Sequence, residues 1–486
     1  MSAATRTPTV ATPTRVTRPT AAAAATTPAA AAPRPVAAAM RGAPGAGGLG
    51  AIDAGSLRLP AQHFAAAMVF LAAGSVGLVA VAPELAAGAF LSPHVAGVTH
   101  LFTLGWLTTT IFGALNQLLP VALGAPVRSA RLGQAGFWSY APGALLFACG
   151  VYRGDTALHH AGLALLTVGI VLLVTNIALS LPRARQRDAT WWAVTLALAS
   201  LIGTLVLGVV LLHNLHTGFL HEQRVRTLAV HLHVALVGWA LVTMVGMSHR
   251  LLPMFLLAHG ANGRWTRRAL ALLPAGLVVL AAGLLLHWPV AAWAGLALLE
   301  AGVVCFLVQC RAFFAKRMRP ALDAGLRFAA VALAFLAASA ALGPAVLALG
   351  GTRHPRLATA YVLLGLLGGV VLYVVGHFYK IVPFLAWIAR FRGRVGRERV
   401  PTVAELYSGR AARLQLALMT AAVVGMAGGV ALGRAALVRT AAVAFAFGVV
   451  LFIAQVVDVV WGVHGASGAR AASVAARGST PAMRAG

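Results

Sequence analysis

The chain has 486 residues, of which 60% are hydrophobic and only 10% charged, and its mean hydropathy is +0.86. A soluble globular protein cannot cover that much apolar surface, so the composition excludes one and makes membrane lipid the expected surroundings. The formal net charge of +28 is divided among loops between apolar runs. No arginine-rich soluble domain remains to bind nucleic acid, and nucleic-acid binding is therefore not expected.

The two ends of the chain differ from the rest in composition. Residues 1–60 are mainly Ala, Pro, Thr and Arg, with almost no large apolar side chains. Such a segment cannot bury a core, and we predict a disordered tail there and a second one at 466–486. The membrane domain is expected at 61–465.

Twelve apolar runs fill this domain, and each can cross a hydrocarbon core of roughly 30 Å. They are predicted near 62–82, 94–122, 134–151, 157–181, 189–213, 227–256, 268–287, 289–312, 326–349, 357–389, 411–433 and 438–462. The runs predict an all-α polytopic membrane protein with twelve transmembrane helices.

Three of the runs repeat one pattern. Each has a proline with one glycine seven residues before it and another fifteen residues before it; these are Gly105, Gly113 and Pro120, Gly238, Gly246 and Pro253, and Gly368, Gly376 and Pro383. Four runs lie between successive prolines, which predicts three four-helix units with pseudo-threefold symmetry, at about 61–181, 189–312 and 326–462. The glycines lie on one helix face, where a neighbouring helix or a flat ligand can approach the backbone.

Positive charge predicts the orientation. Loops after even-numbered runs hold about three times as many Lys and Arg as loops after odd-numbered runs. The positive-inside rule then places both termini in the cytoplasm of a bacterial-type inner membrane.

Most of the 16 histidines map to the outer side in this orientation. His100 and His233 occupy equivalent places in the first two units, and each precedes a Gly-Trp pair. Imidazole is a common ligand of iron, copper and zinc, so both are candidate metal ligands. His231 lies two residues before His233 and points about 200° away on a helix, so these two would serve sites on opposite sides.

Two further groups carry candidate chemistry. His159 and His160 begin the fourth run and His287 ends the seventh, where they can bind a metal or simply reach the headgroups. A second polar set lies in the inner half or within helices: Glu300, Asp458, His249, His377 and Lys380. Ionisable groups in a bilayer are costly, and this set predicts either a proton or water path or ion pairs of Glu300 and Asp458 with Arg250 or Lys380.

The segments "THLFTLGW…GALNQLLPVALGAP" and "HLHVALVGWALVTMVG" resemble helices of subunit I of the haem-copper oxidase superfamily, which includes cytochrome c oxidases and nitric oxide reductases. That family also has twelve helices in three groups of four. It places the His-x-His pair on its tenth helix, whereas the pair here is on the sixth.

The resemblance implies a haem, of b type, with His100, His233 and His231 as candidate ligands. Threefold symmetry would make the second and sixth helices neighbours, so we expect one haem between His100 and His233. Copper is a possible second metal at His287, His159 and His160. It implies electron transfer or an oxidoreductase that reduces nitric oxide or oxygen, with a periplasmic donor such as cytochrome c and with partner subunits. The alternatives are a histidine-lined metal transporter and a membrane subunit without a cofactor.

Overall fold

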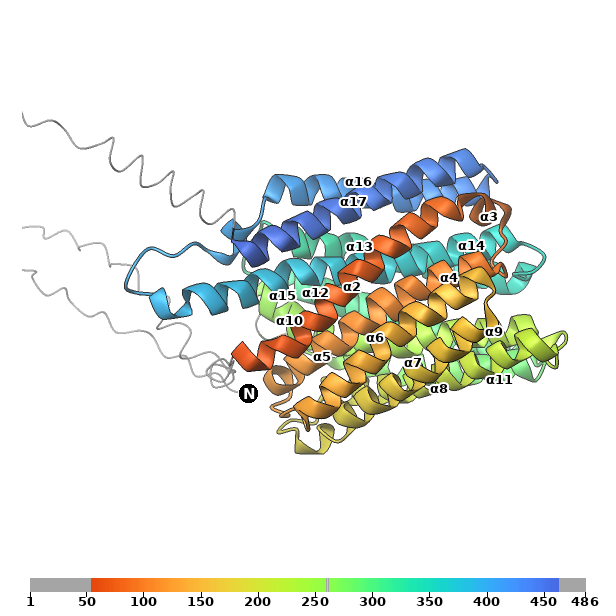
Figure 1. The fold of residues 1–486 in the computed structure, drawn as a ribbon, viewed down its shortest axis with the longest axis horizontal. Helices are drawn as coiled ribbons and strands as arrows, with labels where there is room; N and C mark the ends of the chain where they lie inside the picture. Colours follow the sequence, from red (N-terminus) through yellow and green to blue (C-terminus); the bar gives the residue numbers. More distant parts are fainter. Residues whose placement is uncertain (1–53, 259, 261, 463–486) are drawn as a thin grey trace, which may run out of the picture. The chain divides into compact units, whose positions relative to one another are not determined.

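The computed structural model describes residues 54–258, 260 and 262–462, which fold into long helices packed side by side (Figure 1). No β-strand forms within these ranges. Nearly all of the predicted tails, 1–60 and 466–486, lie outside them. The first helix begins at Ala54, seven residues before the predicted start of the membrane domain.

The helices follow one another in three groups of four, and the second helix of each group is a composite. The first group holds α2 (Ala54–Ala80), the composite of α4 (Pro93–His100), η2 (Leu101–Thr108) and α5 (Thr109–Ala122), then α6 (Ala130–Arg153) and α7 (Thr156–Ala178), with the short α3 (Ala82–Ala87) after α2. The second holds α8 (Ala189–Thr217), the composite of α9 (Gln223–His233), η4 (Val234–Leu241) and α10 (Val242–Leu256), then α11 (Arg264–Leu285) and α12 (Pro289–Ala315). The third holds α13 (Ala324–Leu349), the composite of α14 (Pro355–Leu363), η5 (Leu364–Val371) and α15 (Leu372–Phe391), then α16 (Gly409–Ala431) and α17 (Ala435–Trp461). Short 3-10 turns lie in the loops, η3 (Leu181–Arg183), η6 (Arg392–Arg394) and η7 (Val403–Leu406).

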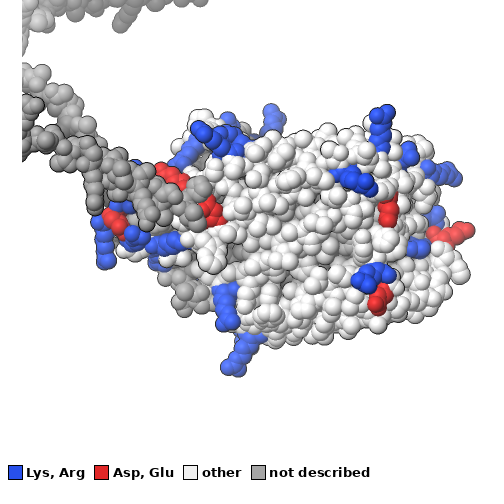
Figure 2. Space-filling model, turned by 45° about the horizontal axis from the view of Figure 1, so that its top comes forward, with Lys and Arg blue, Asp and Glu red and all other residues white. Residues whose placement is uncertain are grey.

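Within the described residues, 11 helices are long and apolar enough to cross a membrane. The remaining predicted span corresponds to α6, which is helical but carries more polar residues. Large apolar side chains point outward, with Val69, Val278 and Phe447 each more than 60% exposed. Charged side chains gather toward the two ends of the bundle, and the face in Figure 2 has a broad uncharged band between them. These features define a multi-pass membrane protein.

The helix bundle has two ends, a histidine end and an arginine end. The histidine end is the end at which α4, α9 and α14 begin, and the arginine end is the one at which α5, α10 and α15 finish (Figure 1).

Each composite helix contains a π-helical stretch of eight residues at the same place in its group. The stretches begin at Leu101, Val234 and Leu364, directly after His100, His233 and Leu363. π-Helical turns are rare and concentrate at functional sites. Their positions repeat at the same intervals as the marker prolines, although sequence periodicity alone gave no sign of them.

The repeated glycines face the first helix of their own group. A Cβ atom on Gly105 would lie 2.5 Å from the Phe70 ring of α2, and one on Gly246 would lie 2.1 Å from Cβ of Ala193 in α8. Gly376 likewise approaches the backbone of Gly325 in α13. The prediction that these glycines admit a close neighbour is confirmed, and the neighbour is a helix.

Glycines also join the third and fourth helices of the first group. A Cβ atom on Gly162 of α7 would lie 2.3 Å from the backbone nitrogen of Phe147 in α6. A Cβ atom on Gly150 of α6 would lie 2.4 Å from the backbone nitrogen of His159 in α7. The backbones of α6 and α7 are therefore in direct contact, and this contact fixes the position of His159.

Candidate functional site

A cavity at the histidine end brings two of the predicted ligands together. His100 comes from the first composite helix and His231 from the second, and both line this cavity. Its walls also include α6, α7 and α8, and they are mainly apolar, with side chains such as Phe147, Leu163, Leu166, Ile170, Leu201 and Leu236. The lining of α8 extends from Leu201 to Gly208, about 10 Å along the helix axis.

His100 is held in one orientation by its own helix. Its Nδ1 donates a hydrogen bond to the Ala96 carbonyl oxygen at 2.7 Å, and its ring lies edge-on to Phe147 with 5.1 Å between the ring centroids. Because a carbonyl only accepts, the proton of the neutral imidazole is on Nδ1 and the lone pair is on Nε2. This is the tautomer that binds a metal through Nε2.

His231 lies on the other side of the cavity, against α8. A Cβ atom on Gly208 would be 3.4 Å from Cε1 of His231, so glycine at this position leaves room for the imidazole ring. Among the described residues, no hydrogen bond of ordinary geometry reaches its Nδ1, although the backbone of Thr204 in α8 lies close enough to interact with the ring.

His233 points away from this cavity. Its Nδ1 donates to the Ala229 carbonyl oxygen at 2.7 Å, and its Nε2 lies 3.2 Å from the hydroxyl of Tyr361 in α14. The opposite directions of His231 and His233 follow the helical spacing used in the sequence analysis. The sequence equivalence of His100 and His233, however, does not bring them together: the structure places His231 with His100, because α8 and the cavity lie on the His231 side of α9.

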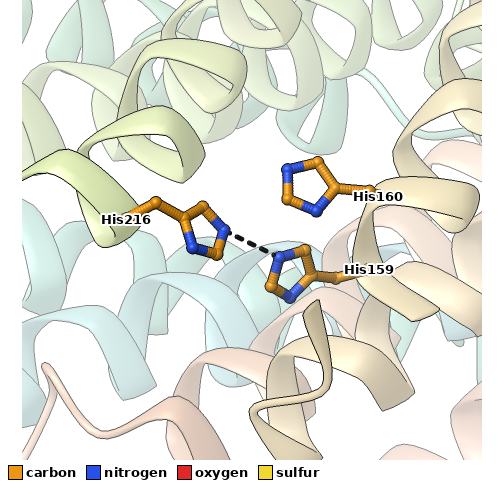
Figure 3. A group of neighbouring side chains, drawn as sticks. All are labelled: His159, His160 and His216. Carbon is orange, nitrogen blue, oxygen red and sulfur yellow. Dashed lines mark hydrogen bonds between the residues drawn. The ribbon is translucent and has the colours of Figure 1, made fainter. Parts of the chain in front are cut away.

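A second cluster of imidazoles lies at the histidine end and is formed by His159 and His160 of α7 and His216 of α8 (Figure 3). One ligand atom from each of the three lies within 4.8 Å of the other two. Nε2 of His159 is 3.1 Å from Nε2 of His216. His159 is buried, whereas His160 and His216 are exposed.

His287 is not part of this cluster. It follows the end of α11, with a positive φ of 56°, and its ring lies beside the amide of Gln223, whose Nε2 is 3.3 Å from Nδ1 of His287. The structure therefore replaces His287 with His216 as the third imidazole of this group. His216 lies in the last turn of α8, and the sequence analysis did not single it out.

The ion pairs of the arginine end differ from the predicted ones. Arg250 pairs with Asp188, and Lys380 pairs with Asp323. Both aspartates also cap the N-termini of helices, Asp188 that of α8 and Asp323 that of α13. The ion pairs of Arg250 and Lys380 therefore involve loop aspartates at the helix ends and not Glu300. The pairing of Asp458 and the alternative of a proton or water path stay predictions.

The remaining polar residues lie on separate helices. Nδ1 of His377 donates to the Tyr373 carbonyl oxygen at 2.9 Å, and His377 lines a mainly apolar cavity among α5, α10 and α15. Within the described part of the chain, the Nδ1 atom of His249 is buried and has no hydrogen-bond partner. The Glu300 carboxylate of α12 lies against Gly343 of α13, and Asp458 lies near the end of α17.

Outside the spans, burial and the nearby Asp323 carboxylate raise the pKa of Tyr407 to about 12.

Two partners were missed by sequence reasoning. His216 and His159 lie at the same end of consecutive antiparallel helices, so the predicted topology contained a signal for their proximity. For Tyr361 there was no such signal, because nothing in the sequence around it marks it as a partner of His233. Comparison with protein-family models finds no family that matches the chain, and comparison with curated proteins finds no relative.

Proposed function

We propose that this chain is a haem-binding integral membrane protein that transfers electrons. The observation that carries the proposal is the cavity lined by His100 and His231, which come from two different composite helices. Two imidazoles that line one mainly apolar cavity are a suitable donor set for a haem iron.

The residues around the cavity fit such a group. His100 presents Nε2 as a free lone pair, and the His231 ring lies at the cavity wall beside Gly208 of α8. The walls are apolar, as the faces of a porphyrin require, and the lining of α8 follows the helix for about 10 Å. When bound, the haem would supply reversible one-electron transfer.

The chain's own residues set what that group can do. His100 and His231 are the only imidazoles among the residues that line this cavity. These two residues would hold the haem iron, and with both imidazoles bound the haem would supply electron transfer rather than reduction of oxygen or nitric oxide. The leucine and phenylalanine walls exclude water and hold the two rings in place.

The proposal includes twelve membrane spans, namely the 11 apolar helices and α6. The three π-helical stretches and the glycine contacts within each group support a pseudo-threefold arrangement. Such an arrangement, together with the two sequence segments quoted above, supports a relationship to subunit I of the haem-copper oxidases. The distribution of positive charge supports cytoplasmic termini in a bacterial inner membrane, with the histidine end facing a periplasmic donor such as cytochrome c.

The test is the visible spectrum of the purified, full-length protein. We expect a Soret band in the wild type, and α and β bands of a low-spin b-type haem after reduction. His100→Ala and His231→Ala should each remove most of the haem, measured as the pyridine haemochrome per protein.

His233→Ala is the matched control, since His233 belongs to the same helix but faces Tyr361. It should keep its haem, and elution as a single species by size exclusion should show that all variants fold. A colourless wild type, or haem loss in His233→Ala but not in His231→Ala, would contradict the proposal.

The alternative of a metal transporter is favoured by one observation, the cluster of His159, His160 and His216. Against it, the cavity among α5, α10 and α15 is lined mainly by Leu, Val, Met and Phe side chains, which do not stabilise an ion in transit. Uptake of Zn²⁺ into liposomes by a colourless protein would favour the transporter.

A further inference from the structure

We propose that His159, His160 and His216 form a binding site for one copper or zinc ion at the histidine end, separate from the haem cavity. The three side chains come from α7 and α8 and point toward one another (Figure 3). The site does not depend on haem binding, because none of its members lines the cavity of His100 and His231.

The distances match those of a metal centre. Two nitrogen ligands about 2.0–2.1 Å from a tetrahedral zinc ion are about 3.3 Å apart. The Nε2 atoms of His159 and His216 are 3.1 Å apart, so an ion can bind both after a small movement of the two side chains. His160 completes the group within 4.8 Å, and because it is exposed its ring can turn toward the ion.

The protonation of the cluster also favours a metal. Two Nε2 atoms can form a hydrogen bond only if one of them carries a proton and the other a lone pair. An ion placed between them replaces this single proton and uses both lone pairs. In His160, Nδ1 donates to the Thr156 carbonyl oxygen at 2.7 Å, which again leaves Nε2 free.

The chemistry of the donors selects the class of ion. All three donors are imidazole nitrogens, which suit copper and zinc and are poor ligands for Mg²⁺ or Ca²⁺. A three-histidine set leaves a fourth position for water or another ligand. His216 lies in the last turn of α8, where the helix dipole favours a cation, and the carboxylate of Asp155 caps the first turn of α7.

The fold holds His159 in place before any ion arrives. Gly150 of α6 lies directly against the backbone of His159, and the His159 side chain is only 4% exposed. One buried ligand and two exposed ligands make a site that ions in solution can reach. Leu163, one helical turn further along α7, already belongs to the wall of the haem cavity.

The experiment uses full-length protein without a histidine tag, purified in detergent and freed of metal. Cu²⁺ alone and Zn²⁺ alone are titrated against a competing chelator, and the Cu²⁺ form is examined by electron paramagnetic resonance. We expect one ion per chain, nitrogen hyperfine structure for Cu²⁺, and competition between the two ions.

His216→Ala and His160→Ala should each weaken binding at least about 100-fold, since each removes a direct ligand. Both residues are exposed, so neither substitution disturbs the core. His213→Ala is the matched control, because His213 is an exposed histidine of the same helix that lies against Phe219 instead; it should bind as tightly as the wild type.

Equal affinity in the wild type and in a variant with all three histidines replaced by alanine would overturn the site, and so would equal weakening by His213→Ala. The Soret band is recorded on the same samples. An unchanged band in His216→Ala separates failure of the metal site from failure of the haem proposal.

Discussion

The composite helices of the first two groups and that of the third share a backbone and differ in their side chains. All three have a π-helical stretch at the same place and glycines against the first helix of their group. His100 and His233 precede the first two stretches, whereas Leu363 precedes the third. The comparison shows that the backbone feature is common to all three composite helices, whereas a histidine precedes the π-helical stretch in only two of them. A π-helical turn therefore does not by itself mark a ligand.

If the glycines of the composite helices are needed for close helix packing, replacing one of them should lower the stability of the protein. In Gly246→Ala the new Cβ atom would lie 2.1 Å from Cβ of Ala193, and α8 would have to move away from α10. We expect a loss of about 3 kcal/mol in the free energy of unfolding. The loss is measured as the thermal or denaturant stability of purified protein in one detergent.

Gly428→Ala is the control for this prediction. Gly428 lies in α16, and a Cβ atom there meets nothing within 4 Å. The change should be neutral or stabilise the protein by up to about 1 kcal/mol through helix propensity. Equal destabilisation by the two substitutions would show that the close helix contact is not what the glycine provides.

The second and third groups each have an ion pair at the arginine end, Arg250 with Asp188 and Lys380 with Asp323. Asp323→Ala removes both the partner of Lys380 and the N-cap of α13. We expect a loss of about 2 kcal/mol, part from the cap and part from the half-buried pair. Asp323→Asn keeps the capping oxygen and should cost about half as much.

Equal losses for Asp323→Ala and Asp323→Asn would mean that the cap contributes nothing. Denaturant unfolding of both variants at low and high salt distinguishes the two contributions, because only that of the ion pair is screened.

The smallest expected effect concerns the difference between His231 and His233. Tyr361→Phe removes the hydroxyl that contacts Nε2 of His233, and we expect a loss of about 1 kcal/mol in stability. The Soret band should not change, because His233 is not among the residues that line the cavity of His100 and His231. A shifted or lost Soret band in Tyr361→Phe would indicate that His233 is a haem ligand.

Much of the fold could be predicted from the sequence because the length of an apolar run is a local signal. Runs such as 289–312 appear as helices within a few residues, here Pro289–Ala315. The span near 134–151 was predicted from a weaker apolar run, and the structure makes it α6, a helix that does not meet the same apolar criterion. The π-helical stretches had no signal, because a π turn changes backbone hydrogen bonding without requiring any particular residue.

The candidate site could be predicted only in part. His100, His159, His160 and His231 were selected as metal ligands because of their residue type and helix position. Their partners depend on which face each helix turns toward its neighbours, and a repeat alignment does not contain this information. That is why His233 was paired with His100 on sequence equivalence, although His231 faces the same cavity, and why His216 was not selected.

The direct contact between the α6 and α7 backbones also bears on biosynthesis. In the part of the chain that the structure describes, α6 is the one long helix outside the apolar set, and its polar side chains find partners in other helices: Gln134 bonds Gln62 of α2, and the Tyr140 hydroxyl donates to the Leu104 carbonyl oxygen. Only Gly154 and Asp155 separate α6 from α7. If α6 spans the membrane as proposed, we expect it to leave the translocon together with α7 as a helical hairpin, with the strongly apolar α7 favouring its integration into lipid.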